Sequence, residues 1–569
     1  MEKKIYMWPS TWKKPMVSGE GGAVSSNNYY ASKAGIEILK QGGNAFDAAV
    51  AVSLVLSVVE PHHSGIGGGC FSLLYSIKTK EVIALDARGI APKNATKDLF
   101  IKDGEVQDEW KDLGGQSVAI PGLYKALDKI LKEYGTMSLK EVSKAAIDYA
   151  RNGFRLSFTG SETMLDDSVQ RKIKLSNSFE KLYLKPNKSY YKFGEIIYNP
   201  ELADLIEKIA NEGVDIFYNG KIANKIIEEI NKRGGVYVKE DLENYQPKFR
   251  TPVKTNYRGY EVVSFAPPSG GSTVIEALNI LENFDLNNME HNSAESIHAI
   301  SEAMKLAFAD RSISMGDPDF VNVNVSKIIS KEFAKKRFLE INKKEATEFV
   351  PDGTIEAKNY PGNTSHFTIM DKYGNAISQT QTVRDWYGSG IVVDGYGFIL
   401  NNAMSDFSAK EGAITSQGLR YGSANSIEGG KTPLSSMSPT LVFKDNQPFL
   451  AIGAAGGPRI ITGIIQGVIN AIDYNMMPEE IVRVPFITSL TKRQGLELEN
   501  GISKDTIELL KNKGHKIIYT PTHEVLSCML NCVMKKDKKY YPCSTERVDG
   551  CGSALTKEGA IIFDGIIQK

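Results

Sequence analysis

The sequence predicts a mixed α/β sandwich, and two observations lead to this fold class. Segments with helical apolar spacing alternate with short strands as far as Lys343. After Thr364 the pattern changes to alternating strands separated by turn residues, and one long isoleucine-rich helix follows them. A polar stretch without period, from about Lys343 to Asn363, separates the two parts.

The helices of the first part are indicated by their composition and apolar spacing. The stretch YASKAGIEILKQGGNAFDAAVAVSLVLSVVEP is rich in alanine and leucine with one Gly-Gly-Asn break, which predicts two helices, the second largely buried. Apolar periodicity predicts further amphipathic helices at Gly122–Tyr134, Leu139–Asn152, Pro200–Gly213, Gly220–Arg233, Ala294–Ala309 and Val325–Glu340.

The second part begins with strands. Turn signals such as Asp-Lys-Tyr-Gly-Asn and Lys-Asp-Asn-Gln separate the predicted strands TSHFTIM, NAISQTQT, FILNN, TLVF and PFLAIG. Isoleucine and valine then recur at helical spacing from Ile460 to Ile472, which predicts a helix buried along one face.

Composition limits the possible functions. With 569 residues, 41% of them hydrophobic, the chain can bury a large core. Sixty-eight basic and sixty-eight acidic residues leave no net charge, so we expect neither nucleic acid nor an anionic membrane as partner, and a small-molecule or peptide substrate is favoured. The start, MEKKIYMWPSTWKKPMVSGEGG, lacks the apolar run of a secretory signal, and no later stretch approaches a membrane span; we expect a cytoplasmic protein.

Cysteine and histidine spacing gives no pattern typical of a metal site. The odd number of cysteines suits a reducing compartment better than a disulfide framework. Two of them lie in HEVLSCMLNCVM, whose alternation indicates a strand, so buried apolar cysteines are favoured over a zinc cluster. The seven histidines form no HExxH-type pair, and we expect no metal. The cysteines are Cys70, Cys528, Cys532, Cys543 and Cys551.

The junction between the two parts is a candidate for self-cleavage. Thr364 begins a predicted central strand directly after a polar linker, where a cut would expose a new α-amine beside a hydroxyl. The unperturbed pKa of an α-amine is about 7.7–8.0, so a large neutral fraction could take the hydroxyl proton. The alternative is an ordinary strand start, since threonine is common there.

Three other segments could serve acyl transfer from such a nucleophile. In GAAGGPRIITGII, Gly456 and Gly457 precede a helix start and could stabilise an oxyanion through their amides, or form only a tight turn. A phosphate loop is disfavoured because no Gly-Lys-Ser/Thr follows. Ser435 and Ser436, in KTPLSSMSPTLVF, could hold a carboxylate, and Arg88, after a strand in ALDARGIAP, could pair with a carboxylate or with a surface acid.

Six stretches, taken together and in order, resemble the γ-glutamyltransferase (glutathione hydrolase) family. They are PHHSGIGGGCFSLLY, LDARGIAP, NTSHFTIMDKYGNAIS, YGSGIVVDGYGFILNNAMSDFSAK, PLSSMSPT and GAAGGPRIITGIIQG. The resemblance runs from about Val17 to the C-terminus. It implies a four-layer αββα sandwich of the N-terminal-nucleophile (Ntn) hydrolase type, a precursor that cuts itself into two subunits, and γ-glutamyl transfer or hydrolysis without a cofactor.

Carried over by position, the resemblance assigns the catalytic residues. Cleavage between Asn363 and Thr364 would give a large subunit of residues 1–363 and a small catalytic subunit of residues 364–569, associated as a heterodimer. Thr364 would be the nucleophile and new N-terminus, and the Thr382 hydroxyl would support its amine. Gly456 and Gly457 would form the oxyanion hole.

The resemblance also assigns donor recognition. Arg88, Ser435 and Ser436 match the residues that hold the donor's α-carboxylate, and Asp406 matches the acid that holds its α-amino group. The donor would be a small γ-glutamyl compound, and the acceptor water, an amino acid or a peptide.

The sequence departs from the family pattern near the α-amino site. Arg384 stands where typical members have Asn, and Ala403 where they have Gln. A cation near Asp406 could neutralise it by pairing, could bind a second substrate carboxylate, or could point away. The aromatic lid residue of some members corresponds to Gln417, which predicts a more open site.

Three functions remain open from the sequence. The first is a γ-glutamyl hydrolase or transferase. The second is a relative on the same scaffold that cuts another amide, such as an acylated amine, an oxamate-like compound or a poly-glutamate. The third is an uncleaved, catalytically silent binding protein.

Overall fold

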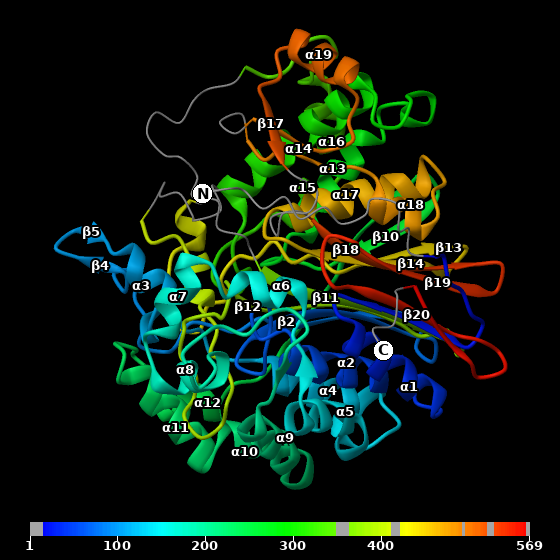
Figure 1. Ribbon diagram of the computed structural model, residues 1–569. Coiled ribbons are helices and arrows are strands. Elements are labelled where there is room, and N and C mark those ends of the chain that lie inside the picture. The colour runs from blue at the N-terminus through cyan, green and yellow to red at the C-terminus, as the bar shows by residue number, and fades with distance from the viewer. Residues whose placement is uncertain (1–14, 349–362, 411–421, 492–494, 521–527, 565–569) are drawn as a thin grey trace.

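In the computed structural model, which describes residues 15–348, 363–410, 422–491, 495–520 and 528–564, two antiparallel sheets lie face to face between layers of helices (Figure 1). The larger sheet has eight strands, in the order β21 (Ile561–Phe563), β20 (Cys551–Leu555), β1 (Gly22–Ser26), β11 (Asn363–Asp371), β12 (Ala376–Arg384), β2 (Gly69–Ser76), β3 (Glu81–Ala87) and β8 (Lys248–Arg250).

The second large sheet has six strands and packs on the first through contacts of β14 and β18 with β11. Its order is β19 (Lys539–Ser544), β18 (Met529–Lys536), β14 (Gln447–Ala455), β13 (Thr440–Lys444), β10 (Tyr260–Ser264) and β9 (Val253–Tyr257). A small sheet joins β15 (Ile487–Thr488), β16 (Leu496–Glu499) and β17 (Ile517–Thr520).

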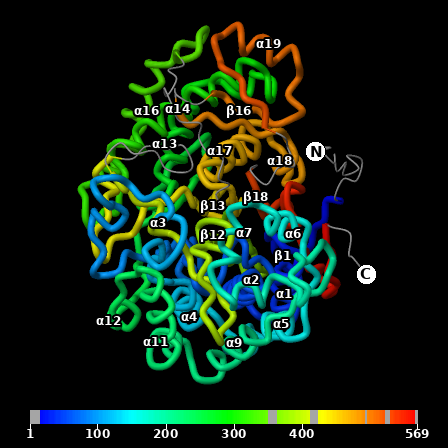
Figure 2. Tube along the Cα trace, turned by 60° about the vertical axis from the view of Figure 1, so that its left-hand side comes forward, coloured from blue at the N-terminus to red at the C-terminus, as the bar shows by residue number. Residues whose placement is uncertain are grey.

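One helical layer covers the outer face of the eight-stranded sheet. Its central helix, α2 (Ala45–Val59), is buried along its whole length and packs on β11 and β12, as its Ala- and Val-rich sequence predicts. Figures 1 and 2 both place this layer on the opposite side of the sheets from α13 and α14. Its main helices are α1 (Tyr29–Lys40), α2 (Ala45–Val59), α4 (Leu123–Tyr134), α5 (Leu139–Asn152) and α9 (Pro200–Glu212), with α11 (Gly220–Asn231) further out.

The other helical layer covers the six-stranded sheet. Helices α13 (Gly271–Leu281) and α17 (Arg459–Ile472) contact its strands, and the isoleucine side chains of α17 are buried in the core beneath them. Helix α18 (Pro478–Arg483) also contacts β18 and β19, and further out lie α14 (Ala294–Ser314), α16 (Lys331–Leu339) and α19 (Lys504–Asn512). The αββα order predicted from the family resemblance is confirmed.

Two predicted elements are wrong. The predicted helix Val325–Glu340 is divided into α15 (Val325–Ile328) and α16, because the Ser330 hydroxyl accepts a hydrogen bond from the Phe333 amide and caps a new helix. The predicted strand FILNN makes only isolated bridges, from Ile399 to Val392 and from Leu400 to Gly67. The other predicted helices and strands are confirmed, with shifts at their ends.

The two segments on either side of residue 363 are interleaved in both large sheets. Strands β11 and β12 lie between β1 and β2, and β10 pairs with β13. A cut at this position would therefore leave two pieces that share both sheets.

The prediction that the cysteines are buried is confirmed in the structure. All five thiols are buried and none forms a disulfide. Burial raises the pKa of the Cys70 and Cys528 thiols to about 12, so both are protonated and unreactive near neutral pH.

The membrane prediction is tested only in part. Within the described ranges, no helix combines the length and apolarity needed to cross a membrane. The expected lack of a signal segment concerns mainly residues 1–14, which lie outside the described residues.

Candidate active site

Thr364 lies near the start of β11, in the middle of the larger sheet, and its exposed fraction is 5%. The pairing with β12 is irregular here, because Asn363 pairs with Arg384 but Ser365 pairs with Gln381. Two residues of β12 therefore oppose Thr364, which is a β-bulge. Bulges re-aim side chains beside active sites, and this one lies at Thr364.

The Thr382 hydroxyl is the centre of the hydrogen bonds around this bulge. It donates to the carbonyl oxygen of Asn363 at 2.6 Å and accepts from the Arg384 amide at 2.8 Å. The Thr364 hydroxyl oxygen lies 3.4 Å from the Thr382 hydroxyl oxygen. The carbonyl that precedes Thr364 is thus polarised by a donor, and the Thr364 hydroxyl lies next to that donor.

A glycine motif gives the backbone room around Thr382. A Cβ atom on Gly68 would lie 2.2 Å from the Thr382 carbonyl oxygen, closer than any side chain tolerates. Any residue other than glycine at position 68 would therefore force the backbone of Gly68 or Thr382 to shift. This gives the GIGGG motif a role in packing against the site.

Gly456 and Gly457 form the turn between β14 and α17. Their φ angles of +122° and +58° lie in the region that favours glycine. Within the described part of the chain, neither amide nitrogen donates a hydrogen bond. Gly453 packs against the His366 ring, so the turn and Thr364 are each only a few residues from that contact. The two amides are thus left without a hydrogen-bond acceptor among the described residues, as an oxyanion hole requires.

The second half of the site is a buried cluster of charges. The Asp406 carboxylate accepts a hydrogen bond from Arg384 Nε at 3.0 Å and another from Arg88 Nη2. Arg384 also pairs with Asp385, and its Nη1 lies 3.7 Å from the nearer carboxylate oxygen of Asp112. Arg384 therefore reaches Asp406, the first of the three arrangements considered from the sequence.

The two arginines differ in their surroundings. Burial lowers the pKa of Arg88, and Asp406 only partly offsets this. Burial also acts on Arg384, but Asp385, Asp406 and Asp112 outweigh it and raise the pKa of Arg384. The Nε of Arg88 is buried and has no hydrogen-bond partner among the described residues. An unpaired donor of this kind is suited to an incoming carboxylate.

Ser435 and Ser436 join the cluster through Asn425. The Asn425 side chain donates to the Asp406 carbonyl at 2.7 Å and accepts from the Leu434 amide at 3.0 Å, which fixes the serine turn beside Asp406. The Ser435 hydroxyl accepts from the Met437 amide at 3.2 Å, and Ser436 is partly exposed.

The structure thus brings most of the predicted residues together. Hydrogen bonds link five of them directly, and the serine turn joins through Asn425. The linked five are Thr364, Thr382, Arg384, Asp406 and Arg88. Ala403 is buried in the short turn that carries Asp406. Gln417 lies outside the described residues.

Sequence reasoning missed the partners that set the charge balance. Asp385 could have been found, because it directly follows Arg384. Asp112 and Asn425 carry no local signal. A separate cluster of His298, Glu302 and His515 was also missed; its only sequence signal is the spacing of His298 and Glu302, which lie one turn apart on α14.

Comparisons with known proteins agree with these observations. The sequence model of the family described as gamma-glutamyltranspeptidase matches residues 31–555. A glutathione hydrolase proenzyme of Escherichia coli (strain K12) is 38% identical, over 93% of this chain and 91% of its own. The crystal structure of cephalosporin acylase from Bacillus halodurans superposes with a TM-score of 0.85 at 26% identity, covering 98% of this chain and 99% of that one. A chain of Helicobacter pylori gamma-glutamyltranspeptidase, 38% identical, superposes with a TM-score of 0.57 and covers 58% of this chain but 95% of its own length.

Proposed function

The chain belongs to the γ-glutamyltranspeptidase family, and we propose that it cuts itself between Asn363 and Thr364 and then transfers or hydrolyses γ-glutamyl groups. The observation that carries the proposal is the 2.6 Å hydrogen bond from the Thr382 hydroxyl to the Asn363 carbonyl, beside the Thr364 hydroxyl. The E. coli relative is called a proenzyme, and the H. pylori chain has the coverage expected of one piece of a divided protein; both support the cut.

Cleavage begins with attack of Thr364 Oγ1 on the carbonyl carbon of Asn363. The C–O bond forms, the C–N bond breaks, and the hydroxyl proton ends on the nitrogen, which becomes the α-amine of Thr364. The Thr382 hydroxyl donates to the carbonyl oxygen as negative charge develops there. Water then hydrolyses the ester, which restores the Thr364 hydroxyl and leaves a carboxylate on Asn363.

In turnover, the α-amine of Thr364 acts as the base for its own hydroxyl. The hydroxyl oxygen attacks the donor amide, and the amides of Gly456 and Gly457 stabilise the oxyanion. The amine product takes a proton and leaves, and an acyl group remains on Thr364. Water or the amine of an amino acid or peptide then takes this acyl group. No cofactor is needed for these steps.

Donor binding falls to the charged half of the site. Arg88 Nε, with Ser435 and Ser436, would bind the α-carboxylate of a small γ-glutamyl donor. Asp406 would bind its α-ammonium group, in competition with Arg384. The H. pylori and E. coli names support a γ-glutamyl donor.

Two measurements test the proposal. Intact-mass analysis of the purified protein should show two species, residues 1–363 and residues 364–569, and the Thr364→Ala variant should show one. A panel of amides with and without an α-amino group should then show turnover of γ-glutamyl-p-nitroanilide. Full activity in a single uncut chain would contradict the mechanism, and turnover of other amides alone would contradict the donor.

A further inference from the structure

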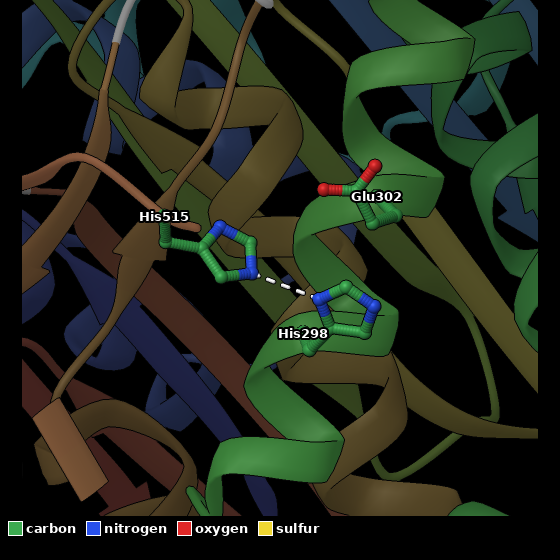
Figure 3. A group of neighbouring side chains, drawn as sticks. All are labelled: His298, Glu302 and His515. Carbon is green, nitrogen blue, oxygen red and sulfur yellow. Dashed lines mark hydrogen bonds between the residues drawn. The ribbon is translucent and has the colours of Figure 1, made fainter. Parts of the chain in front are cut away.

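Outside the active site, three buried side chains of metal-ligating type meet between α14 and the end of α19. They are His298, Glu302 and His515, whose exposed fractions are 2%, 2% and 5% (Figure 3). One ligand atom from each lies within 4.8 Å of the others. Two imidazoles and one carboxylate are ligands that zinc binds in proteins.

The two histidines face each other through one ring nitrogen each. Each of these nitrogens carries a lone pair in one of the two neutral tautomers of its ring. His298 Nδ1 lies 2.9 Å from His515 Nε2. Two nitrogens bound to one zinc ion lie about 3.4 Å apart, since each bond is about 2.1 Å long and the angle is tetrahedral. A movement of about half an ångström would therefore admit an ion between them.

The orientation of His298 is fixed from behind. Its other nitrogen, Nε2, lies 2.8 Å from the carbonyl oxygen of Asn342, so it carries the proton and leaves the Nδ1 lone pair directed at His515. Hydrogen bonding of the distal ring nitrogen to a backbone carbonyl is the usual support of a metal-binding histidine.

His515 is held by the end of α19. The His515 amide donates to Leu510 O at 3.1 Å, the Gly514 amide donates to Lys511 O at 2.8 Å, and Gly514 has a φ of +92°. This is a Schellman motif, which stops the helix at a defined angle. Burial lowers the pKa of His298 and lowers that of His515 to about 4, so both rings are neutral near pH 7.

Glu302 is restrained but not saturated. Lys305 Nζ binds Oε1 at 2.7 Å, and Thr347 donates to Oε2 through both its amide and its hydroxyl, at 3.2 and 2.5 Å. A carboxylate has about four lone pairs, so it can accept these bonds and still ligate an ion. When no ion is bound, the ammonium group of Lys305 compensates the negative charge of the buried Glu302 carboxylate.

We propose that His298, Glu302 and His515 form a binding site for one divalent transition-metal ion, with zinc as the favoured ion. The ion takes the place of the proton between the two histidines. That proton moves from Nε2 to Nδ1 of His515, so that His298 Nδ1 and His515 Nε2 both become ligands. Lys305 competes with the ion for Glu302.

The site joins segments that lie on opposite sides of residue 363. His298 and Glu302 belong to the first segment and His515 to the second. If the chain is cut as proposed above, the ion also links the two pieces, and this consequence rests on the proposed function. Binding of the ion itself does not depend on the cut.

The test is zinc titration of the chelator-dialysed full-length protein in competition with a chromophoric chelator. We expect one equivalent to bind, with affinity reduced at least about 100-fold by His298→Ala, His515→Ala or Glu302→Gln, more than the loss typical of a supporting residue. Lys305→Gln removes the competing cation and should tighten binding about 10-fold. His291→Ala is the matched control, because His291 contacts Asn470 and Tyr474 outside the cluster and should not affect binding.

Each outcome decides the proposal. Failure of the folded protein to bind zinc, or equal binding by the Glu302→Gln variant, would overturn it. Glu302→Gln keeps the side-chain volume, so it carries the test if a histidine variant does not fold. Repeating the titration on uncut Thr364→Ala protein separates this proposal from the cleavage, because binding should persist there. In the cut protein, zinc should raise the urea concentration at the midpoint of unfolding for the wild type but not for the Glu302→Gln variant.

Discussion

The two halves of the candidate active site are built from different chemistry. Around Thr364 the functional groups are hydroxyls and backbone amides, arranged by a β-bulge and a glycine turn. Around Asp406 they are formal charges, and Arg88, Arg384 and Asp385 compensate one another in a buried cluster. The first half depends on positions within tenths of an ångström, so a lost group should abolish a step. The second depends on a balance of charges, so substitutions should give graded effects.

The largest effect is expected at Thr364. Thr364→Ala removes the attacking oxygen, so neither the cut nor turnover should be detectable above about 10⁻³ of the wild-type rate. Thr364→Ser keeps the hydroxyl but loses the methyl group that restricts its rotamers, so it should retain part of both activities. Gel analysis and initial rates measure the two. Substantial amidase activity in the Ala variant would remove Thr364 from the mechanism.

The next effect is expected at Thr382. Thr382→Val keeps the branched shape but loses the donor to the Asn363 carbonyl, so self-cleavage should slow by about 10²–10³-fold, the usual cost of one oxyanion donor. Thr382→Ser restores the hydroxyl and serves as the control. The time course of cleavage in fresh protein is the measurement. A normal time course in the Val variant would mean that the hydrogen bond does not assist the cut.

In the charged half, Arg88→Lys should act mainly on donor binding. Lysine keeps the charge but has no Nε, the donor left unpaired in the structure. A charged hydrogen bond contributes about 1.5–3 kcal/mol, so KM should rise about 10- to 100-fold while kcat changes less. Cleavage should be intact, because it involves no donor. An unchanged kcat/KM for a γ-glutamyl donor would assign Arg88 to structure instead.

The contrast between the halves also explains what the sequence could predict. Thr364, Thr382 and the glycine turn lie in contiguous motifs that the family resemblance covers, so their roles could be carried over by position, and alternating patterns indicated the strands that hold them. The compensation of Arg384 by Asp112 could not be predicted, because the two come from unrelated segments and only tertiary packing joins them. His298 and His515 are a stronger case, because they lie 217 positions apart in the sequence and share no motif.

The two wrong elements have different origins. The apolar spacing of Val325–Glu340 continues across Ser330, but a local cap divides the helix there, because the side chain of Ser330 competes for a backbone amide. FILNN has strand-like composition, yet its neighbours in space give it only isolated bridges. Local propensity does not include the availability of a partner strand.

The smallest effect is expected at Arg384, where the residue typical of the resembled family is Asn. Arg384 Nε occupies one oxygen of Asp406, so an α-ammonium gains less there than at an unpaired acid. Arg384→Asn should be tolerated by the backbone, because φ is +84° and Asn is enriched at positive φ. Arg88 still pairs with Asp406 in the variant, so the gain is only part of one charged hydrogen bond, about 1 kcal/mol.

The quantity to measure is the ratio of kcat/KM for γ-glutamyl-p-nitroanilide to that for its glutaryl analogue, which lacks the α-amine. A general loss of folded enzyme lowers both values and leaves the ratio unchanged, whereas release of Asp406 raises the first alone. We expect the Asn variant to raise the ratio about 3- to 10-fold, on the scale of about 1 kcal/mol, and Arg384→Lys, which keeps a cation beside Asp406, to raise it less. An unchanged ratio in the Asn variant would mean that Asp406 is neutralised by Arg88 alone, and that donor choice is set by the arginine the family pattern already contains.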